Sequence, residues 1–430
     1  MYNIDWAAIR TSGTVTPAVE TSAAPRPRAA WLPRVSPVVW SLGFTSLLTD
    51  ISSEMVSSIL PMYLVLFLRV SPAAFGVIDG LYQGFAVLVR IAAGFASDRW
   101  QRHKLVAAVG YGLTAACRLA ILGVGSAWMG IAAIVAIDRT GKGIRTAPRD
   151  ALISLSTPPR ELARAFGVHR ALDAAGAMLG PLAAFLILST LGDAFDVLFV
   201  ISFLVAVLGV AVIVLFVREA DETADASVTG SAVGARQLLS ESRFRAVVLA
   251  AVALSAATIS DGFIFLMLQR QLGFSAGTFP LLFVGLSLVN FVLSAPSGRA
   301  ADRLGRARVF LAGHALLLLA YFVILAPVGG YTRLALCLVL LGAYYSATDG
   351  VLAAITSAML PRQLCGGGLS IVASATNLGR LAGSVAFGAI WNWWGLQYAT
   401  GFFIMSLGCA LVYAVFMLRP LRVEDDIATA

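Results

Sequence analysis

The chain has 430 residues, of which 59% are hydrophobic and 13% are charged, and its mean hydropathy is +0.86. Soluble domains are about 45–50% apolar and about 25% charged, so this composition leaves too little polar surface to cover a water-soluble globule. The formal net charge is +8, but the basic residues gather in the joints between apolar segments, which argues against a nucleic-acid-binding protein.

The first 35 residues are rich in Ala, Pro, Ser, Thr and Arg and contain no apolar core. A cleavable signal peptide needs such a core. The segment therefore predicts a disordered cytoplasmic tail, with the first spanning helix acting as an uncleaved signal anchor.

Apolar segments follow one another from this tail onwards. A helix that spans the bilayer needs roughly 20 apolar residues. The segments lie at residues 37–67, 74–97, 104–123, 127–150, 163–189, 196–217, 246–268, 278–297, 308–327, 333–358, 369–390 and 397–418. The expected fold class is an all-α polytopic membrane protein with 12 transmembrane helices.

One joint is longer and more polar than the others. It begins at Arg218 and is rich in Ser, Thr, Ala and Gly. The joint divides the segments into two sets of six. The expected domains are a tail (1–35), an N-terminal half (36–217), a cytoplasmic linker (218–245), a C-terminal half (246–418) and a second tail (419–430).

The Arg and Lys content of the loops predicts the orientation. Most Arg and Lys residues of the loops and tails fall on the same side as both termini. The loops on the opposite side hold only Arg69, Arg270 and Arg333. The positive-inside rule therefore places both termini in the cytoplasm.

The loop between the second and third segments recurs between the eighth and ninth. The shared residues are Gly94, Asp98 and Arg99 in the first copy and Gly298, Asp302 and Arg303 in the second, at an offset of 204 residues. Both copies resemble the G-x-x-x-D-R-x-G-R-R/K signature of the major facilitator superfamily (MFS), although Gln101 replaces the second glycine of the first copy. The resemblance implies two six-helix halves related by duplication. The two aspartates are expected to latch one state of the carrier by accepting hydrogen bonds at a facing helix N-terminus.

The fifth segment carries a second family signature. Gly167, Gly176, Gly180 and Pro181, followed by Ala184, resemble the antiporter signature G-x8-G-x3-G-P-x2-G of the superfamily. The resemblance implies exchange of substrate for protons, and hence export. The small residues predict tight packing, and the proline a kink, where this helix contacts the other half.

The fourth segment carries several charges. Arg139, Gly143 and Ala147 match the R-x-x-x-G-x-x-x-A skeleton of the superfamily, which implies a role for Arg139 in proton coupling. A second set is spaced 4, 3 and 4 residues apart and so shares one helical face. This set is Asp138, Lys142, Arg145 and Arg149. Because a charge inside the membrane costs on the order of 2.5–3.5 kcal/mol, the face is expected to line a wet cavity or to pair internally. Snorkelling of the last two arginines at the cytoplasmic end is the alternative.

The first segment carries Asp50 and Glu54, one turn apart on one face. Burial disfavours the charged form of a carboxyl, so either residue is a candidate for binding the transported proton. The alternative is a static ion pair with a nearby cation, for which Arg139, Arg90 and Arg118 are the candidates.

Other charges inside the predicted helices are expected to line a substrate cavity with Asp138, Lys142 and Arg145. They are Arg90, Arg118 and Asp173 in the N-terminal half and Asp261, Asp349 and Arg380 in the C-terminal half. The last two are also candidates for a structural ion pair. Aromatic residues of the C-terminal half are candidates for shaping the pocket: Phe263, Phe265, Tyr344 and Tyr345.

Neither a metal site, a disulfide nor a cofactor is expected. The four cysteines have no CxxC spacing and no nearby histidine. They are Cys117, Cys337, Cys365 and Cys409. The chain also lacks the GxxxxGK[ST] phosphate loop of an ATP-driven pump.

The expected function is that of a proton-coupled antiporter in a bacterial inner membrane, which exports a small amphiphilic or anionic molecule as a monomer by rocking of its two halves. The expected partners are the substrate, protons and the lipid bilayer. One alternative is a proton symporter that imports an organic anion held by Lys142, Arg145 and Arg118. A more remote alternative is a membrane enzyme or sensor, which the absence of a catalytic constellation disfavours.

Overall fold

The computed structural model describes residues 35–100, 102–158, 161–217, 238–326, 329–360 and 364–419, which belong to one compact unit, Val35–Ala430. The description excludes the side chains of residues 88, 90–100, 163, 276 and 365. All regular secondary structure of the described residues is helical, as predicted. Most residues of the predicted tails and linker lie outside this description, so those domain boundaries stay predictions.

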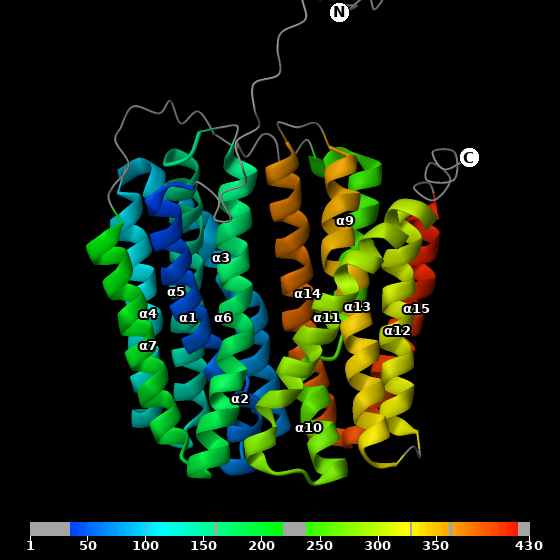
Figure 1. The fold of residues 1–430 in the computed structure, drawn as a ribbon. Helices are drawn as coiled ribbons and strands as arrows, with labels where there is room; N and C mark the ends of the chain where they lie inside the picture. The colour runs from blue at the N-terminus through cyan, green and yellow to red at the C-terminus, as the bar shows by residue number, and fades with distance from the viewer. Residues whose placement is uncertain are drawn as a thin grey trace, which may run out of the picture. The chain divides into compact units, whose positions relative to one another are not determined.

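The N-terminal half forms one group of helices (Figure 1). Its elements are α1 (Pro37–Ser57), α2 (Leu60–Met62), η1 (Tyr63–Phe67), α3 (Pro72–Trp100), α4 (His103–Val124), α5 (Trp128–Leu155), α6 (Leu162–Leu191) and α7 (Phe195–Phe216).

The C-terminal half forms a second group beside the first (Figure 1). Its elements are α9 (Ser242–Ala256), α10 (Asp261–Leu272), η3 (Ala276–Thr278), α11 (Pro280–Leu304), α12 (Arg306–Leu325), α13 (Gly330–Ala358), α14 (Cys365–Trp394) and α15 (Leu396–Met417).

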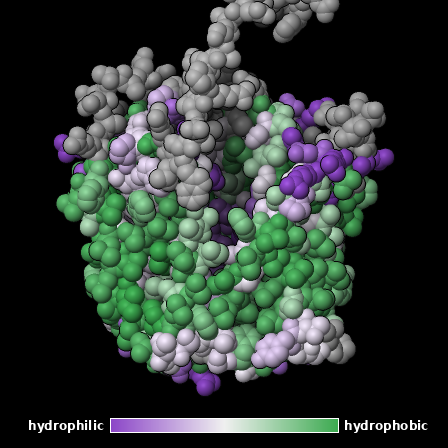
Figure 2. All heavy atoms as spheres, viewed as in Figure 1, coloured by the Kyte–Doolittle hydropathy of each residue, from purple (hydrophilic) through white to green (hydrophobic). Residues whose placement is uncertain are grey.

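The described residues contain nine helical segments that are long and apolar enough to cross a membrane. Their outward side chains are largely hydrophobic, for example Leu215, Phe291 and Met405, which are 72%, 79% and 69% exposed. Figure 2 shows a broad hydrophobic band with hydrophilic residues at its edges and in a hollow at its centre. This surface suits a surrounding of lipid tails. The helices α3, α5 and α14 are not among the nine, so the count of twelve spans stays a prediction.

The first helix of each half is interrupted. The α1 helix ends at Ser57, and the chain resumes at α2, whose Pro61 has no N–H to donate. The α9 helix ends at Ala256 and α10 starts at Asp261, although the sequence predicts one continuous segment there. At this second break the Ile259 N–H donates to Tyr321 Oη at 2.6 Å, which satisfies a backbone donor that the helix leaves unpaired.

The two halves pack closely along α3 and α14. A Cβ added to Gly76 would lie 2.6 Å from the Ser384 carbonyl oxygen, so glycine is needed for this approach. The Ser384 hydroxyl also donates to Asp79 Oδ2 at 2.6 Å. These contacts lie in the first third of α3, on the side where α2 and α10 meet, away from the described end of α1 at Pro37 (Figure 1).

The duplicated loop is described in its second copy only. There Asp302 faces Arg306 Nη2 at 4.0 Å, one turn further along the chain, and its side chain is 73% exposed. Arg303 is exposed, and a Cβ added to Gly298 would meet nothing within 4 Å. The side chains of the first copy (Gly94, Asp98 and Arg99) lie outside the description, so the latch role of both copies stays a prediction.

Candidate functional site

The two helix breaks face one cavity of about 240 Å³, here called the central cavity. The break after α1 contributes Glu54, Ser57, Leu60 and Pro61, and the start of α10 contributes Asp261 and Gly262. The remaining lining residues are Phe75, Asp79, Tyr82, Gln83, Lys142 and Phe283. Interrupted helices at matching positions of two repeats are a known way to place binding groups in mid-membrane.

Three carboxylates and one ammonium line the central cavity. Each carboxylate accepts a hydrogen bond from a hydroxyl: Glu54 from Ser57 at 2.6 Å, Asp79 from Ser384 at 2.6 Å and Asp261 from Tyr345 at 2.8 Å. Among the described residues none of the three forms an ion pair. The central cavity therefore holds more carboxylates than cationic groups.

Two residues at the centre of α5, Asp138 and Arg139, belong to a buried group of ion pairs. The Asp138 carboxylate binds Arg118 Nη2 at 3.0 Å and Arg139 Nε at 2.9 Å. Arg118 also donates to Ser53 Oγ on α1 at 2.9 Å. The Arg139 guanidinium lies 3.9 Å from the centroid of the Tyr82 ring, a cation–π contact that reaches the wall of the central cavity. The two arginines and one aspartate are thereby linked to α1, α3 and α4.

The charged face of α5 continues into a second ion pair. Arg145 Nη2 lies 3.6 Å from Asp50 Oδ1, and its guanidinium lies 4.5 Å from the centroid of the Tyr111 ring. The cation that the structure places beside Asp50 is therefore Arg145, whereas two of the candidates from the sequence, Arg139 and Arg118, bind Asp138. The Arg145 side chain is 3% exposed, which rules out snorkelling for this residue in the observed state.

The last pairs on this face involve α6. Arg149 binds Asp150 at 2.9 Å and reaches Asp173 at 4.0 Å. Ser46 on α1 donates to Asp173 Oδ1 at 2.8 Å. The face therefore pairs internally at Asp138, Arg145 and Arg149, while Lys142 lines the central cavity.

The glycines of the antiporter-like signature pack against α1 of their own half. A Cβ added to Gly176 would lie 2.6 Å from Leu47 O and 3.0 Å from Asp50 Cβ. One added to Gly180 would lie 2.8 Å from Glu54 Cβ. The prediction that these residues pack against the other half is wrong for both positions. Gly167 has open space around it, and Pro181 lies inside α6.

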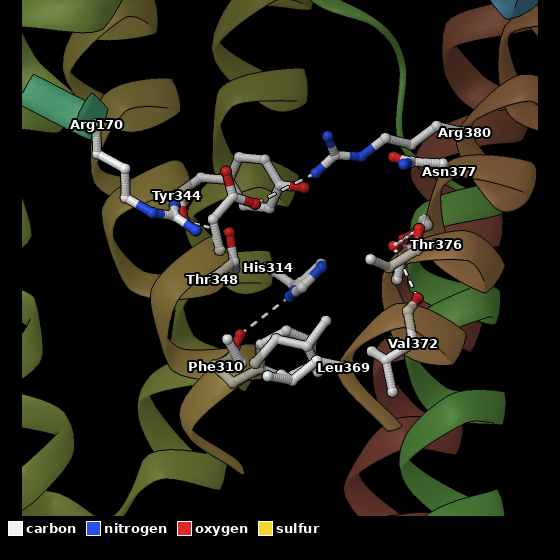
Figure 3. Close-up of a pocket in the computed structure, with 15 residues that line it drawn as sticks. Arg170, Phe310, His314, Tyr344, Thr348, Leu369, Val372, Thr376, Asn377 and Arg380 are labelled. Carbon is white, nitrogen blue, oxygen red and sulfur yellow. Dashed lines mark hydrogen bonds and ion pairs between the residues drawn. The ribbon is translucent and has the colours of Figure 1, made fainter. Parts of the chain in front are cut away.

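A larger cavity of about 380 Å³ lies mainly in the C-terminal half and is here called the C-terminal cavity. Arg170 of α6 reaches it from the other half, and the remaining lining residues belong to α9, α12, α13 and α14 (Figure 3). Arg380 Nη2 lies 3.4 Å from Asp349 Oδ1, so the structural pair considered from the sequence does form. His314 Nδ1 lies 3.0 Å from the Phe310 carbonyl oxygen, which fixes that nitrogen as the donor.

The structure thus divides the predicted site residues among three places. Glu54, Lys142 and Asp261 line the central cavity, and Asp349 and Arg380 line the C-terminal cavity. Ion pairs hold Asp50, Arg118, Asp138, Arg139, Arg145 and Asp173, of which only Asp173 is substantially exposed. The side chain of Arg90 lies outside the description.

Sequence reasoning missed Asp79, Tyr82, Arg170 and His314 as cavity residues. Asp79 was detectable as an ionisable residue within an apolar segment. Of the aromatic candidates, Tyr344 lines the C-terminal cavity and Tyr345 binds Asp261, whereas two pack in the hydrophobic core: Phe263 and Phe265.

Within the described part of the chain no group of three or more His, Cys, Asp or Glu side chains is placed to hold a metal ion. Cys117, Cys337 and Cys409 are free thiols. The side chain of Cys365 falls outside the description.

One relative of known sequence matches most of the chain, and another matches about a third of it. An uncharacterized MFS-type transporter of Methanocaldococcus jannaschii is 30% identical over 366 residues, which cover 82% of this chain and 88% of the relative. An uncharacterized protein of Mycobacterium tuberculosis (strain H37Rv) is 33% identical over 154 residues, 36% of this chain and 37% of that protein.

Solved structures share the fold at low sequence identity. The nucleoside transporter NupG has a TM-score of 0.72 at 14% identity and covers 89% of this chain and 98% of its own. A bacterial homolog of the human lysosomal transporter Spinster has a TM-score of 0.70 at 14% identity and covers 90% of this chain and 97% of its own.

The sequence profile of the Major Facilitator Superfamily matches residues 42–275 and 247–429. The chain therefore belongs to the major facilitator superfamily and is a membrane-embedded transporter, not an enzyme.

Proposed function

We propose that this chain is a proton-coupled antiporter that exports a small amphiphilic or anionic molecule by alternating access. The observation that carries the proposal is the position of Glu54. Its carboxylate lines the central cavity between the two halves, with the Ser57 hydroxyl at 2.6 Å and no ion pair among the described residues. Such a group can gain and lose a proton from the cavity without breaking a salt bridge.

Glu54 suits this role better than Asp50, the other candidate on α1. Asp50 faces Arg145 at 3.6 Å, so protonating it would leave a buried guanidinium without its counter-charge. Protonating Glu54 instead leaves Lys142, on the wall of the same cavity, with Asp79 and Asp261 to balance it. We therefore assign the transported proton to Glu54.

Arg139 couples this site to the helices around it in our proposal. Its guanidinium is bonded to Asp138 and stacks on Tyr82, and Tyr82 lines the cavity with Glu54. A change of charge on Glu54 therefore acts on the Tyr82–Arg139 contact at close range, inside a region of low dielectric constant.

The side on which the halves part indicates which state of the transport cycle the structure represents. They are joined along α3 and α14 at the end away from the start of α1, and a hydrophilic hollow lies between them (Figure 2). The Arg and Lys distribution places the termini in the cytoplasm of a bacterium. Under that orientation the observed state is open to the cytoplasm, a state that exporters and importers share, so the proposed export rests on the antiporter-like signature of α6.

The test uses inside-out membrane vesicles that contain the protein and are acidified inside, followed with a ΔpH-sensitive dye. Cationic drugs, organic anions and metal chelates are added in turn. We expect a compound that collapses the gradient with the wild type and not with Glu54→Gln. The matched control is Glu241→Gln, because Glu241 is exposed at the start of α9 and should leave transport unchanged.

Three results would contradict parts of the proposal. Equal gradient collapse by Glu54→Gln and the wild type would remove Glu54 as the proton carrier. Loss of coupling in Asp50→Asn alone would transfer that role to Asp50. If no compound moves protons while the protein is folded, proton antiport loses its support.

A second candidate function is the symport of protons with an imported organic anion. The observation that favours it is the presence of basic side chains, Lys142, Arg170 and Arg380, on the walls of the two cavities. Symport predicts that adding the substrate makes the medium around intact cells more alkaline. Antiport predicts no such uptake of protons with the substrate.

A further inference from the structure

The two cavities carry opposite charge. The central cavity has three carboxylates (Glu54, Asp79 and Asp261) against one ammonium, Lys142. The C-terminal cavity has two guanidinium groups against one carboxylate: Arg170 and Arg380 against Asp349. An excess of carboxylates attracts protons or cations, whereas an excess of guanidinium groups attracts anions.

Arg380 has hydrogen-bond donors to spare. A guanidinium carries five N–H donors, and the one hydrogen bond described for Arg380 is to Asp349 at 3.4 Å, beside a cation–π contact with the Tyr345 ring at 5.9 Å. Its Nε is buried and has no acceptor among the described residues. The Asp349 side chain is 60% exposed, so water solvates this carboxylate and the pair is loose. An incoming oxygen anion would therefore satisfy a donor that the protein leaves unpaired.

Arg170 approaches the same cavity from the opposite half. It lies on α6, and its side chain points into the cavity from the side opposite α14 (Figure 3). Arg170 and Arg380 face the C-terminal cavity from the two halves of the transporter, and their like charges repel each other when the cavity holds only water. An anion placed between them replaces this repulsion with two attractions.

The other walls suit an organic molecule. His314 uses Nδ1 to bind the Phe310 carbonyl, which leaves Nε2 for a ligand. The apolar side chains of Phe310, Leu369 and Val372 line the cavity below the arginines (Figure 3). A volume of about 380 Å³ lies within the range of about 300–1,000 Å³ that is typical of small-molecule sites.

We propose that the C-terminal cavity is the substrate site and that it binds an organic anion, whose carboxylate or phosphate group is held between Arg380 and Arg170. Binding draws α6 and α14 together and so favours closure of this side of the transporter. The inference rests on the proposed transport function, and it narrows the cargo to anions and separates their site from the proton site at Glu54.

The test measures binding to the purified full-length protein in detergent by calorimetry. The probes are hydrocinnamate, phenyl phosphate and phenethylamine, which share an aromatic ring and differ in charge. We expect binding of at least one anion and no binding of the amine. Losing a charge-assisted hydrogen bond should weaken affinity about tenfold or more, so Arg380→Gln and Arg170→Gln should both show this loss.

The matched control is Arg164→Gln, since Arg164 is an exposed arginine of α6 that does not line the cavity. It should bind like the wild type. Arg380→Lys keeps the charge but not the paired donors, and it should bind more weakly than the wild type in a protein of similar thermal stability.

The inference is overturned if neither anion binds at millimolar concentration, if the amine alone binds, or if both Arg→Gln variants keep wild-type affinity. Its failure is distinguishable from failure of the proposed function. If anion binding needs both Arg380 and Arg170 but no proton moves in vesicles, the anion site in the C-terminal cavity is supported and the proposed proton coupling is wrong. Proton exchange driven by cationic drugs alone supports antiport and removes the anion site.

Discussion

Asp138 is a buried carboxylate that neutralises two buried arginines. Arg118 and Arg139 bind its two oxygen atoms, and the three side chains are between 4% and 7% exposed. Removing one member of such a group leaves an uncompensated charge in a medium that solvates it poorly. We attribute to this residue a structural role that supports the coupling arginine, rather than contact with the substrate.

The substitution Asp138→Asn should therefore destabilise the protein strongly. Breaking a buried ion pair costs about 3–5 kcal/mol, because two guanidinium groups would share no anion. The measurement is thermal unfolding of the purified protein in detergent. The control is Asp302→Asn, since Asp302 is 73% exposed and lies 4.0 Å from Arg306, a surface pair worth about 0–1 kcal/mol. Similar unfolding temperatures for the two variants would contradict the structural role of Asp138.

At the scale of the helix, the contact between α1 and α6 links the family signature to the proposed proton site. Gly176 and Gly180 face the turns of α1 that carry Asp50 and Glu54. Helices that meet through glycine can approach closely, so a shift of α6 moves the backbone that holds both carboxylates. The signature thus packs against the helix of its own half that carries the proposed proton site.

The substitution Gly180→Ala should slow proton-coupled transport. The added methyl group would lie 2.8 Å from Glu54 Cβ and from the backbone of Met55, so α1 and α6 must separate. Overpacking of this kind costs about 1–3 kcal/mol, enough to reduce the rate about tenfold if it falls on the transport step. Gly167→Ala is the control, because nothing lies within 4 Å of that position. Vesicle assays in which both variants transport equally well would exclude this coupling.

Sequence spacing predicted much of this organisation and missed three aspects of it. Apolar segments and duplicated motifs identify the helices and the family, because both depend on local composition. The partner of a glycine motif depends on which helices meet in space, so Gly176 and Gly180 were assigned to the wrong neighbour. The break before Asp261 was missed because Thr258, Ile259 and Ser260 are compatible with a continuous helix. Ion-pair partners such as Asp50 and Arg145 likewise depend on the relative rotation of α1 and α5.

At the scale of the whole molecule, the proton site and the proposed substrate site lie on different sets of helices. Glu54 and Lys142 belong to the N-terminal half, whereas Arg380 and Asp349 belong to the C-terminal half. The halves meet where Ser384 of α14 donates to Asp79 of α3, on the wall of the central cavity. Coupling between proton and substrate is therefore expected through the relative position of the halves and through α13 and α14, which line the C-terminal cavity and also donate to Asp261 and Asp79 of the central cavity.

If the halves rock about this contact, distances at the two ends of the molecule must change in opposite directions. Spin labels at Arg164→Cys and Gly367→Cys report the separation of α6 and α14 at one end, and labels at Thr190→Cys and Trp394→Cys report it at the other. All four positions are exposed, and the native cysteines would first be replaced by serine. Double electron–electron resonance measures both distances. We expect Glu54→Gln, which mimics the protonated carboxyl, to shorten the distance between α6 and α14 at one end and to lengthen it at the other. The pair Arg164→Cys and Thr190→Cys spans α6 alone and should not change. Changes of the same sign at both ends would indicate expansion of the whole molecule and would exclude rocking as the response to the proton.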